Sequence, residues 1–431
     1  MNKRKYLVCA CGILLGIACA NVSASSAQLY FNNASGLGNA NAGEAAIADD
    51  ASTVYNNPAG LTLIDHPQLV AGMVEGRFDG HFVGTDTYAI PGVVSIAQTG
   101  YTNGIPTYGP YPFVYYSHPI NDAFTFGFGM LTPFGIGIQI PQASRVRYAG
   151  TRFLMYDIDL SPSIGWRITD ALSFGLGLDL QYLEYYTRSM SPSFTGGPDA
   201  KTINDAHDWA TGFHFGFLYK LNQKIRAGLT FHSQTVFHPN GRSEYVFTPG
   251  AYVGNEIVSN SYKFKTLVPA TTTVSIYDDV TPQWAMMGTV GYSKWSALRQ
   301  TIYQNIAAPT STGGPSQVNG PTTQYYHDTW RVAVGTNYKV NPRWTVRLGT
   351  SFESDPTNDK YRPLTDPGSQ AISLNVGVHY QALKTLGLDL GYQHSFISAS
   401  SVNTVNGLNT EYGQVYMDRD ALGGQLTWDI V

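Results

Sequence analysis

The sequence predicts an all-β fold, a transmembrane antiparallel β-barrel of about 14 strands with a small N-terminal hatch in its lumen, and three observations lead there. Only 13% of the 431 residues are charged, about half of the roughly 25% that is usual in soluble domains. Glycine and aromatic residues are abundant, with 45 Gly, 29 Tyr, 20 Phe and 7 Trp. From about residue 68 onward, apolar and polar residues alternate with a period of two, which places them on opposite faces of a strand.

Residues 1–27 are predicted to be a cleaved signal peptide. A basic stretch precedes an apolar run, and two small-x-small sites follow, which places cleavage after Ala24 or after Ala27. All three cysteines lie in this leader, so the exported chain has no disulfide framework; Cys19 also leaves a lipoprotein open as an alternative. The leader removes three of the 26 basic residues and no acidic one, so 23 basic and 30 acidic residues remain, a net charge of −7. This modest negative charge gives no reason to expect a nucleic-acid partner.

Residues 28–66 interrupt the alternation and are expected to form a compact hatch inside the barrel. The segment is rich in Ala, Asn and Gly, which favours short helices and turns over strands. Two glycines suggest a nucleotide loop, but the third glycine is absent at the required spacing, so we reject that interpretation. A pair of aspartates is placed to cap a short helix, and an Asn-Pro dipeptide indicates a turn. The expected hatch residues are Gly36, Gly38, Asp49, Asp50, Asn57, Pro58 and Ala59.

Residues 67–431 are expected to form the barrel. In 172–182, Leu and aromatic residues alternate with Ser, Gly, Asp and Gln, over a longer run than soluble sheets usually need. The same pattern recurs in 209–221, 344–353, 372–380, 386–393 and 421–430. Short polar turns join some of these runs, and the longer connections are predicted as loops at 189–206, 238–256, 305–323 and 397–411. Tight turns at one end and long loops at the other are typical of outer-membrane barrels, which have an even number of strands.

One apolar segment, 130–138, is a candidate binding surface. It is expected to leave a strand at its loop end, and exposed apolar patches tend to mark binding surfaces; a simple lipid-facing role is the alternative. Pro106, Pro110 and Pro112 crowd the preceding strand, where a proline interrupts the hydrogen-bond ladder and a lateral gap can form. An ordinary proline-rich loop explains the same three prolines equally well. The candidate substrate-binding residues here are Thr132, Phe134, Gly135 and Ile136.

Several blocks of the sequence resemble the FadL/TodX family of outer-membrane transporters for hydrophobic compounds. They are SGLG at 35–38, GEAAIADD at 43–50, NPA at 57–59, PQW at 282–284 and DTWRVAVG at 328–335. The resemblance extends over most of the mature chain. It implies a monomeric 14-stranded barrel in the bacterial outer membrane, surrounded by lipid and lipopolysaccharide. It also implies that long-chain fatty acids or similar molecules are captured at extracellular loops and released laterally into the membrane without a cofactor.

The resemblance also implies basic residues that meet a substrate carboxylate. The best candidates are Arg188 and Arg299, which stand one and three residues away from the family positions, so an uncharged aromatic or alkane hydrocarbon is an open alternative substrate. Arg145, Arg147 and Arg152 are further candidates, although loop arginines more often face solvent or lipopolysaccharide.

Three other classes of function are weighed against transport of hydrophobic molecules. A general porin agrees with the polar inner face but not with the hatch. A surface adhesin would use the long loops, but nothing in them names a partner. An enzyme lacks support, because neither the His-Glu-x-x-His nor the Gly-x-Ser-x-Gly motif occurs. His214, His232 and His379 are expected to face the lumen as hydrogen-bonding groups, so we expect no catalytic residue, no metal site and no cofactor.

Overall fold

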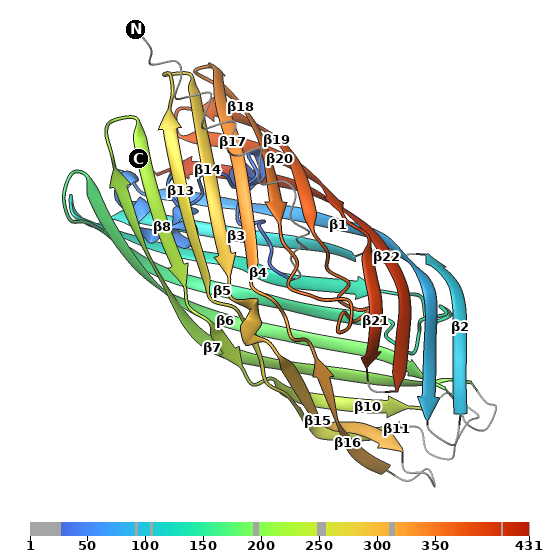
Figure 1. Ribbon diagram of the computed structural model, residues 1–431. Coiled ribbons are helices and arrows are strands. Elements are labelled where there is room, and N and C mark those ends of the chain that lie inside the picture. The colour runs from blue at the N-terminus through green and yellow to red at the C-terminus, as the bar shows by residue number, and fades with distance from the viewer. Residues whose placement is uncertain are drawn as a thin grey trace.

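The structure is a computed structural model, and it describes residues 27–90, 94–103, 107–192, 198–247, 256–309, 315–406 and 408–430. The leader with its three cysteines, the cleavage site after Ala24 and the proline at 106 lie outside these ranges. The described chain forms a closed antiparallel β-barrel around its own N-terminal segment (Figure 1). No helix in the described ranges has the length and apolar character that a membrane crossing requires.

Fourteen strands close the barrel, as the sequence predicted. In order around the ring they are β1 (Gln68–Ile90), β3 (Thr107–Pro119), β4 (Phe124–Gln139), β5 (Arg152–Arg167), β6 (Leu172–Ser191), β7 (Ala200–Lys220), β8 (Ile225–His232), β13 (Thr271–Asp279), β14 (Trp284–Ser293), β17 (Thr329–Asn341), β18 (Trp344–Glu353), β19 (Ala371–Leu383), β20 (Leu386–Ile397) and β22 (Asn409–Asp429). The ring closes because β1 pairs with β3 along one edge and with β22 along the other.

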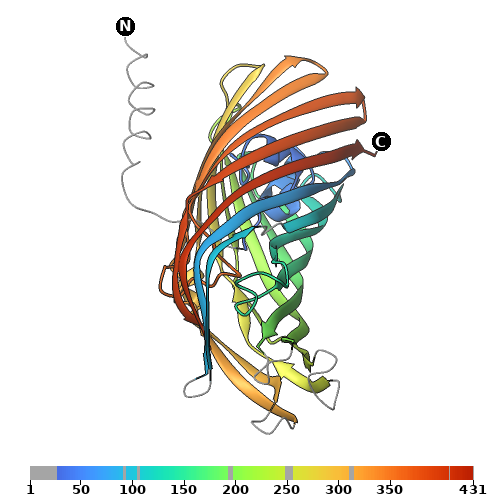
Figure 2. The same ribbon diagram turned by 90° about the vertical axis from the view of Figure 1, so that its right-hand side faces the viewer.

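The two ends of the barrel differ. At one end, called the turn end, connections of two to four residues join β3–β4, β5–β6, β7–β8, β13–β14, β17–β18 and β19–β20. The opposite end, called the loop end, carries the long connections and projects beyond the ring, as Figure 2 shows at the bottom of the view. The additional strands there are β2 (Val94–Asn103), β9 (Thr235–Phe237), β10 (Asn240–Val246), β11 (Glu256–Lys263), β12 (Thr266–Val268), β15 (Gln300–Pro309), β16 (Pro315–Thr323) and β21 (Ser400–Asn406).

The prediction that 189–206, 238–256, 305–323 and 397–411 are loops is wrong for the strands that they contain. The ranges include the start of β7, all of β10, the β15–β16 hairpin and β21. These strands are rich in Thr, Ser, Asn and Gly and pair with each other at the loop end. Their composition resembles that of a loop because they lie beyond the outward apolar band, so no alternation between apolar and polar residues is required of them.

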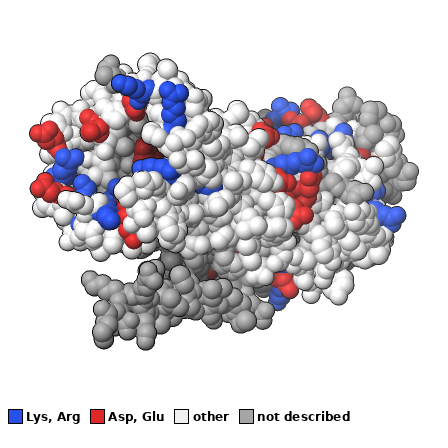
Figure 3. Space-filling view, turned by 90° about the horizontal axis from the view of Figure 1, so that it is seen from above, with Lys and Arg blue, Asp and Glu red and all other residues white. Residues whose placement is uncertain are grey.

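The alternation predicted for the barrel strands corresponds to an apolar outer face and a polar inner face. On β6, Leu178 is 54% and Leu180 36% exposed, whereas Asp179 and Gln181, which alternate with them, are buried. The space-filling view shows charged side chains gathered at the two ends and an uncharged band between them (Figure 3). This is the surface that a bilayer-spanning barrel presents to lipid.

The hatch segment, residues 28–66, lies inside the barrel near the turn end (Figure 2). Its elements are α2 (Ala34–Gly38), α3 (Thr53–Asn56) and the 3-10 helix η1 (Pro58–Leu63). The Asn33 side chain accepts from the backbone N–H of Gly36 at the start of α2. Asp50 accepts from the N–H of Ser52 at 2.9 Å, and thus caps the turn before α3. Short helices with polar caps are therefore what this Ala- and Asn-rich segment forms, as predicted.

Glycines in the barrel wall let the hatch segment approach the strands directly. A Cβ atom on Gly228 of β8 would lie 1.7 Å from the carbonyl oxygen of Ala45, and one on Gly349 of β18 would lie 2.2 Å from that of Asn39. No side chain can occupy such positions unless the hatch moves. The wall and the hatch are therefore fitted to each other backbone against backbone.

Gly228→Val is expected to displace the hatch segment without unfolding the barrel. Overpacking of a tight interface typically costs about 1–3 kcal/mol, and here the clash is with hatch backbone that cannot rotate away. The measurement is the rate at which protease cleaves the hatch in detergent-solubilised protein that still migrates as a folded barrel. Gly424→Val is the matched control, because a Cβ at Gly424 would meet nothing within 4 Å. Equal cleavage rates in the two variants would refute the expectation.

Candidate functional site

Strand β4 bends at a bulge in the middle of the barrel wall. Its pairing with β5 shifts between Leu131 and Phe134, so that Thr132 and Pro133 together stand opposite one residue of β5. The pairing of β4 with β3 ends at Met130. In the described residues, the second half of β4 therefore has no ladder to β3. The sequence predicted that the segment 130–138 leaves the strand at its loop end, and this is wrong. The segment stays within β4 and bends there.

A pocket of about 350 Å³ occupies the place where the ladder between β3 and β4 is interrupted. We call it the lateral pocket. Its lining is mostly apolar and includes Pro110, Tyr111, Pro112, Met130, Leu131, Thr132, Gly135, Ile136, Leu154, Met155 and Ile158. Three of the four residues predicted in this segment thus lie together at one opening, and two of the three prolines line its other edge. Leu154 and Ile158 alternate with the inward Asp157 on β5, whereas Leu131 is buried in the core next to the hatch, so the lining of the pocket takes residues from both faces of the wall.

The first residues of the hatch segment take the place of the missing ladder. The N–H of Leu29 donates to the carbonyl of Pro133 at 2.8 Å, and the N–H of Gly135 donates to the carbonyl of Ala27 at 2.7 Å. Gln28 forms a β-bridge with Phe134 between these two bonds. The bulge of β4 is therefore held by the N-terminal end of the hatch segment, which links the hatch to the opening.

Phe134 points away from the lateral pocket and into the lumen. It is 4% exposed, and its ring meets that of Trp295 edge-on, with centroids 6.1 Å apart. The buried cluster around it contains Leu183, Phe237, Val268, Trp295 and Tyr326. These residues come from β6, β9, β12, the 3-10 helix η2 (Trp295–Ala297) and the segment before β17. Apart from Leu183 of β6, they lie in connections whose approach to the lumen depends on the fold, so sequence reasoning missed them.

A groove of about 850 Å³ lies at the loop end beside this cluster. We call it the loop-end groove. Its apolar lining residues are Val236, Phe264, Leu267, Ala297, Leu298 and Ile302, and its basic ones include Lys263, Lys265 and Arg299. Leu298 also packs against the buried cluster around Phe134. The predicted residue Arg299 is exposed here, with its guanidinium 5.8 Å from the centroid of the Tyr325 ring.

A smaller pocket of about 220 Å³, called the inner pocket, contains the other predicted arginine. Arg188 and Arg152 are opposite each other on β6 and β5, and both line this pocket. Arg152 also lines the lateral pocket. Neither forms an ion pair with a carboxylate of the described residues, and the Nε of Arg188 donates to the Thr151 hydroxyl at 3.0 Å. Arg188 and Arg299 therefore lie in two different pockets. The basic residue next to Arg188 is Arg152.

Tyrosines and one acid complete the inner pocket. Its aromatic side is formed by Tyr185, Tyr262 and Tyr303, and the first and last of these share a hydrogen bond between their hydroxyls at 3.0 Å. Asp366, in the connection after β18, accepts from the Tyr326 hydroxyl at 2.7 Å, and burial raises the pKa of this carboxyl. The charged residues that line the inner pocket are therefore two arginines and one carboxyl whose burial disfavours its negative charge.

The remaining loop arginines are occupied elsewhere. Arg147 pairs with Asp199 through its Nε at 2.6 Å, and its guanidinium also contacts Tyr148. Arg145 donates to the carbonyl of Thr99 at 2.5 Å. Neither lines the inner pocket, the lateral pocket or the loop-end groove. Both act as structural ties between connections at the loop end.

The predicted hatch residues hold the hatch to the wall. Asn57 is the most heavily used: its Nδ2 donates to the carbonyls of Ala45 at 2.6 Å and Phe217 at 3.0 Å, and its Oδ1 accepts from the N–H of Ala59 at 3.1 Å. Pro58 begins η1, so its missing N–H costs no hydrogen bond. The remaining side of the hatch is anchored by Asp50.

Asp50 accepts from Gln425 of β22 at 2.7 Å and from the Ser35 hydroxyl at 3.3 Å. Gly36 and Gly38 allow close approach in α2, the latter against the backbone of Gly377. Asp49 faces the turn end, where it lines a polar cavity of about 790 Å³ beneath the hatch and lies 3.9 Å from Arg347. None of the predicted hatch residues lines the loop-end groove or the lateral pocket.

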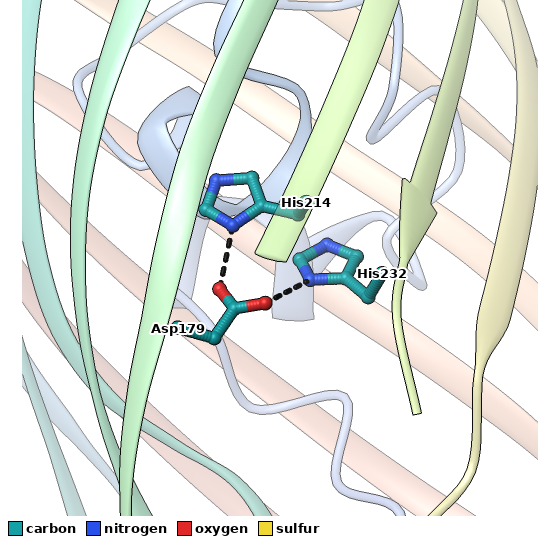
Figure 4. Close-up of side chains that lie close together, drawn as sticks. All are labelled: Asp179, His214 and His232. Atoms are coloured by element: carbon teal, nitrogen blue, oxygen red, sulfur yellow. Dashed lines mark hydrogen bonds and ion pairs between the residues drawn. The ribbon is translucent and has the colours of Figure 1, made fainter. Parts of the chain in front are cut away.

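Two of the three histidines expected in the lumen meet at one carboxylate. His214 of β7 and His232 of β8 both turn toward Asp179 of β6 (Figure 4). The third, His379, lies at the turn end, where it pairs with Asp389 at 3.1 Å. The inward direction of all three was predicted from the alternation, but their carboxylate partners were not.

The fold and these pockets can be compared with known proteins. A family model described as "Outer membrane protein transport protein (OMPP1/FadL/TodX)" matches residues 16–427. The chain belongs to this family. Members of the OMPP1/FadL/TodX family are outer-membrane proteins, so the turn end faces the periplasm and the loop end faces the outside.

Curated relatives and solved structures agree with this assignment. The long-chain fatty acid transport protein of Escherichia coli O6:H1 is 27% identical over 427 residues, which cover 91% of this chain and 92% of that protein. Outer membrane protein P1 of Haemophilus influenzae is 26% identical and covers 91% and 90%. A Pseudomonas aeruginosa FadL homologue superposes with a TM-score of 0.80 at 20% identity, over 94% of this chain and all of that one. The Ralstonia pickettii toluene transporter TbuX superposes at 0.63 with 15% identity, over 90% and 95%.

Proposed function

We propose that this OMPP1/FadL/TodX protein carries long-chain fatty acids, or molecules of similar apolar character, passively across the outer membrane. The observation that supports this most strongly is the interrupted ladder of β4, where an apolar pocket takes residues from both faces of the wall. A molecule captured in the loop-end groove would pass the buried cluster around Phe134 and leave through the lateral pocket into the bilayer. Each step exchanges one apolar surface for another, so the route needs no energy source and no cofactor.

The position of the hatch segment favours a lateral exit over an axial one. The hatch fills the lumen on the periplasmic side, and the cavity beneath it is lined by charged residues that include Asp49, Arg226, Arg347 and Asp389. Such a cavity does not lower the free energy of an acyl chain relative to water, because apolar groups are stabilised by apolar surroundings. The same filling argues against a general porin. Transport in this form requires no catalytic residue, and one chain suffices, with outer-membrane lipid and lipopolysaccharide around the barrel.

The facing pair of Arg152 and Arg188 favours an acid over a hydrocarbon as the substrate. Their guanidinium groups have no carboxylate partner among the described residues, and the inner pocket places them beside an aromatic wall. Arginine recognises carboxylates well because its planar donors match the two oxygens. The alternative, an uncharged aromatic or alkane hydrocarbon, is supported by the similarity to toluene transporters and by the apolar lining of the lateral pocket.

Arg188→Ala is expected to weaken binding of a long-chain fatty acid by about 10-fold or more, because a hydrogen bond to a charged group contributes about 1.5–3 kcal/mol. Arg299→Ala should change it by less than about threefold, since exposed charge pairs contribute little. The measurement is equilibrium binding to purified protein in detergent, with a chain-matched alkane as competitor. Arg343→Ala, in the periplasmic turn between β17 and β18, is the control. If acid and alkane compete equally and Arg188→Ala has no effect, the hydrocarbon alternative is correct.

A further inference from the structure

Asp179, His214 and His232 form a buried cluster where the barrel wall meets the hatch. The side chains of Asp179 and His214 are 3% and 0% exposed, and that of His232 is 12% exposed. The Nδ1 of His214 lies 2.5 Å from one carboxylate oxygen of Asp179, and the Nδ1 of His232 lies 3.7 Å from the other. The two imidazole rings are stacked, with centroids 4.8 Å apart. One donor atom from each residue lies within 4.8 Å of the other two.

The outer nitrogen of each histidine is fixed by the hatch. Nε2 of His214 lies 3.1 Å from the carbonyl oxygen of Val54, and Nε2 of His232 lies 3.1 Å from that of Tyr55. Nε2 of His214 also lies 3.1 Å from the Ser163 hydroxyl, which can either donate or accept. A hydrogen on each Nε2 satisfies both hatch carbonyls, and we consider that tautomer here. In the neutral imidazole, Nδ1 then presents a lone pair, and both lone pairs face the Asp179 carboxylate. In this tautomer the lone pair of His214 lies 2.5 Å from the carboxylate, a distance that requires a positive charge between them, either a proton or a metal ion.

The surroundings of the cluster are acidic. Asp157 and Asp159 on β5 are fully buried, and their carboxylate oxygens accept no well-formed hydrogen bond from the described residues, although Ser161 and Gln181 lie beside Asp159. Asp179 is the charged group that acts on both of these carboxylates, and Asp157 also acts on Asp159. Unpaired buried carboxylates are costly unless a cation is near.

We propose that Asp179, His214 and His232 bind a divalent transition-metal ion of the zinc type between the barrel wall and the hatch. Two imidazoles and one carboxylate are ligands that zinc prefers. Histidines that bind metal usually donate their other ring N–H to a backbone carbonyl or a carboxylate, and here each Nε2 lies 3.1 Å from a hatch carbonyl that can accept from it. The sequence predicted no metal site, because neither histidine stands in a metal-binding motif and the three residues meet only through the pairing of β6, β7 and β8.

The site would tie the hatch to the wall. Val54 and Tyr55 lie in α3, and the ring of Tyr55 packs on that of His232 with centroids 4.4 Å apart. A bound ion would fix both imidazoles and, through their Nε2 hydrogens, the carbonyls of α3. This assignment is independent of which molecule the barrel transports. The test therefore measures metal binding and not uptake.

The test uses the full mature chain in detergent, stripped with EDTA, loaded with Zn²⁺ and desalted. We expect about one zinc per chain by elemental analysis, and an X-ray absorption shell of nitrogen and oxygen at about 2.0–2.2 Å. His214→Gln and Asp179→Asn should each weaken binding by more than about 100-fold, because even the loss of an outer partner costs about 10–100-fold. His394→Gln is the matched control, since His394 pairs with Asp420 at 2.9 Å away from the cluster.

Retention of the folded barrel in each variant is checked by its heat-dependent migration in gels. If a variant does not fold, Co²⁺ replaces Zn²⁺ in the unmutated protein, where bound cobalt is expected to give visible bands that Zn²⁺ abolishes. Less than about a tenth of a zinc per chain would overturn the proposal and assign the cluster to protons. Full zinc binding in both His214→Gln and Asp179→Asn would also overturn it.

Discussion

Deletion of Pro133 is expected to reduce fatty-acid uptake at least about 10-fold while leaving capture at the cell surface intact. The bulge of β4 contains one residue more than the facing stretch of β5. Removing Pro133 restores the register, since Leu131, Thr132 and Phe134 can then face Asp159, Ile158 and Asp157 in sequence. A straight β4 can continue its ladder toward β3, which closes the lateral pocket.

Uptake is measured with a labelled long-chain fatty acid in cells that lack their own transporter, and capture is measured as binding to purified protein. Pro133→Ala is the matched control, because it keeps the extra residue and therefore the bulge. The account requires that the deletion and the substitution differ. If the deletion variant folds, binds and still transports at the rate of the unmutated protein, the lateral pocket is not the exit.

Asn57→Ala is expected to loosen the hatch and turn a plugged barrel into a leaky one. The substitution removes one acceptor and two donor contacts and leaves the carbonyls of Ala45 and Phe217 without that partner. Each unsatisfied buried group costs about 1–3 kcal/mol, so a total of several kcal/mol is expected. We expect steady ion conductance in planar bilayers where the unmutated protein shows little.

The control for this experiment is Asn222→Ala. Asn222 caps the exposed periplasmic turn between β7 and β8, where its Oδ1 accepts from the backbone N–H groups of Lys224 and Ile225. Both variants lose an asparagine with backbone partners, so a general loss of stability would affect both. Equal conductance in the two variants would contradict the role assigned to Asn57.

The sequence predicted well those features that depend on neighbours along the chain. The outward apolar faces follow from alternation within single strands, as for Leu176 and Leu178, because lipid requires the same character of every outward residue. The strand number was predicted from how often this alternation recurs along the chain. The helical character of residues 28–66 was predicted from their local Ala, Asn and Gly content. The resemblance to the family contributed the hatch, whose glycine and asparagine contacts the structure then placed.

Features that depend on register could not be predicted. Arg152 lies opposite Arg188, and Asp179 lies between two histidines, only because β5, β6, β7 and β8 pair in one particular alignment. A shift of one residue would turn Asp179 toward lipid and away from the two histidines. The bulge at Pro133 could not be predicted either. A proline indicates that a hydrogen-bond ladder is interrupted, but it does not indicate which neighbouring strand loses its pairing. The strands at the loop end were missed because their residues face no lipid.

The most direct test of the account is to trace a photoreactive long-chain fatty acid through the protein in outer membranes and to map the labelled residues by mass spectrometry. The account predicts labels in the loop-end groove and in the lateral pocket, at residues such as Ile136 and Leu154, and predicts that only the lateral labels disappear when Pro133 is deleted. Labels in the polar cavity beneath the hatch, around Gln283 and Lys339, with none in the lateral pocket, would show an axial route and contradict it.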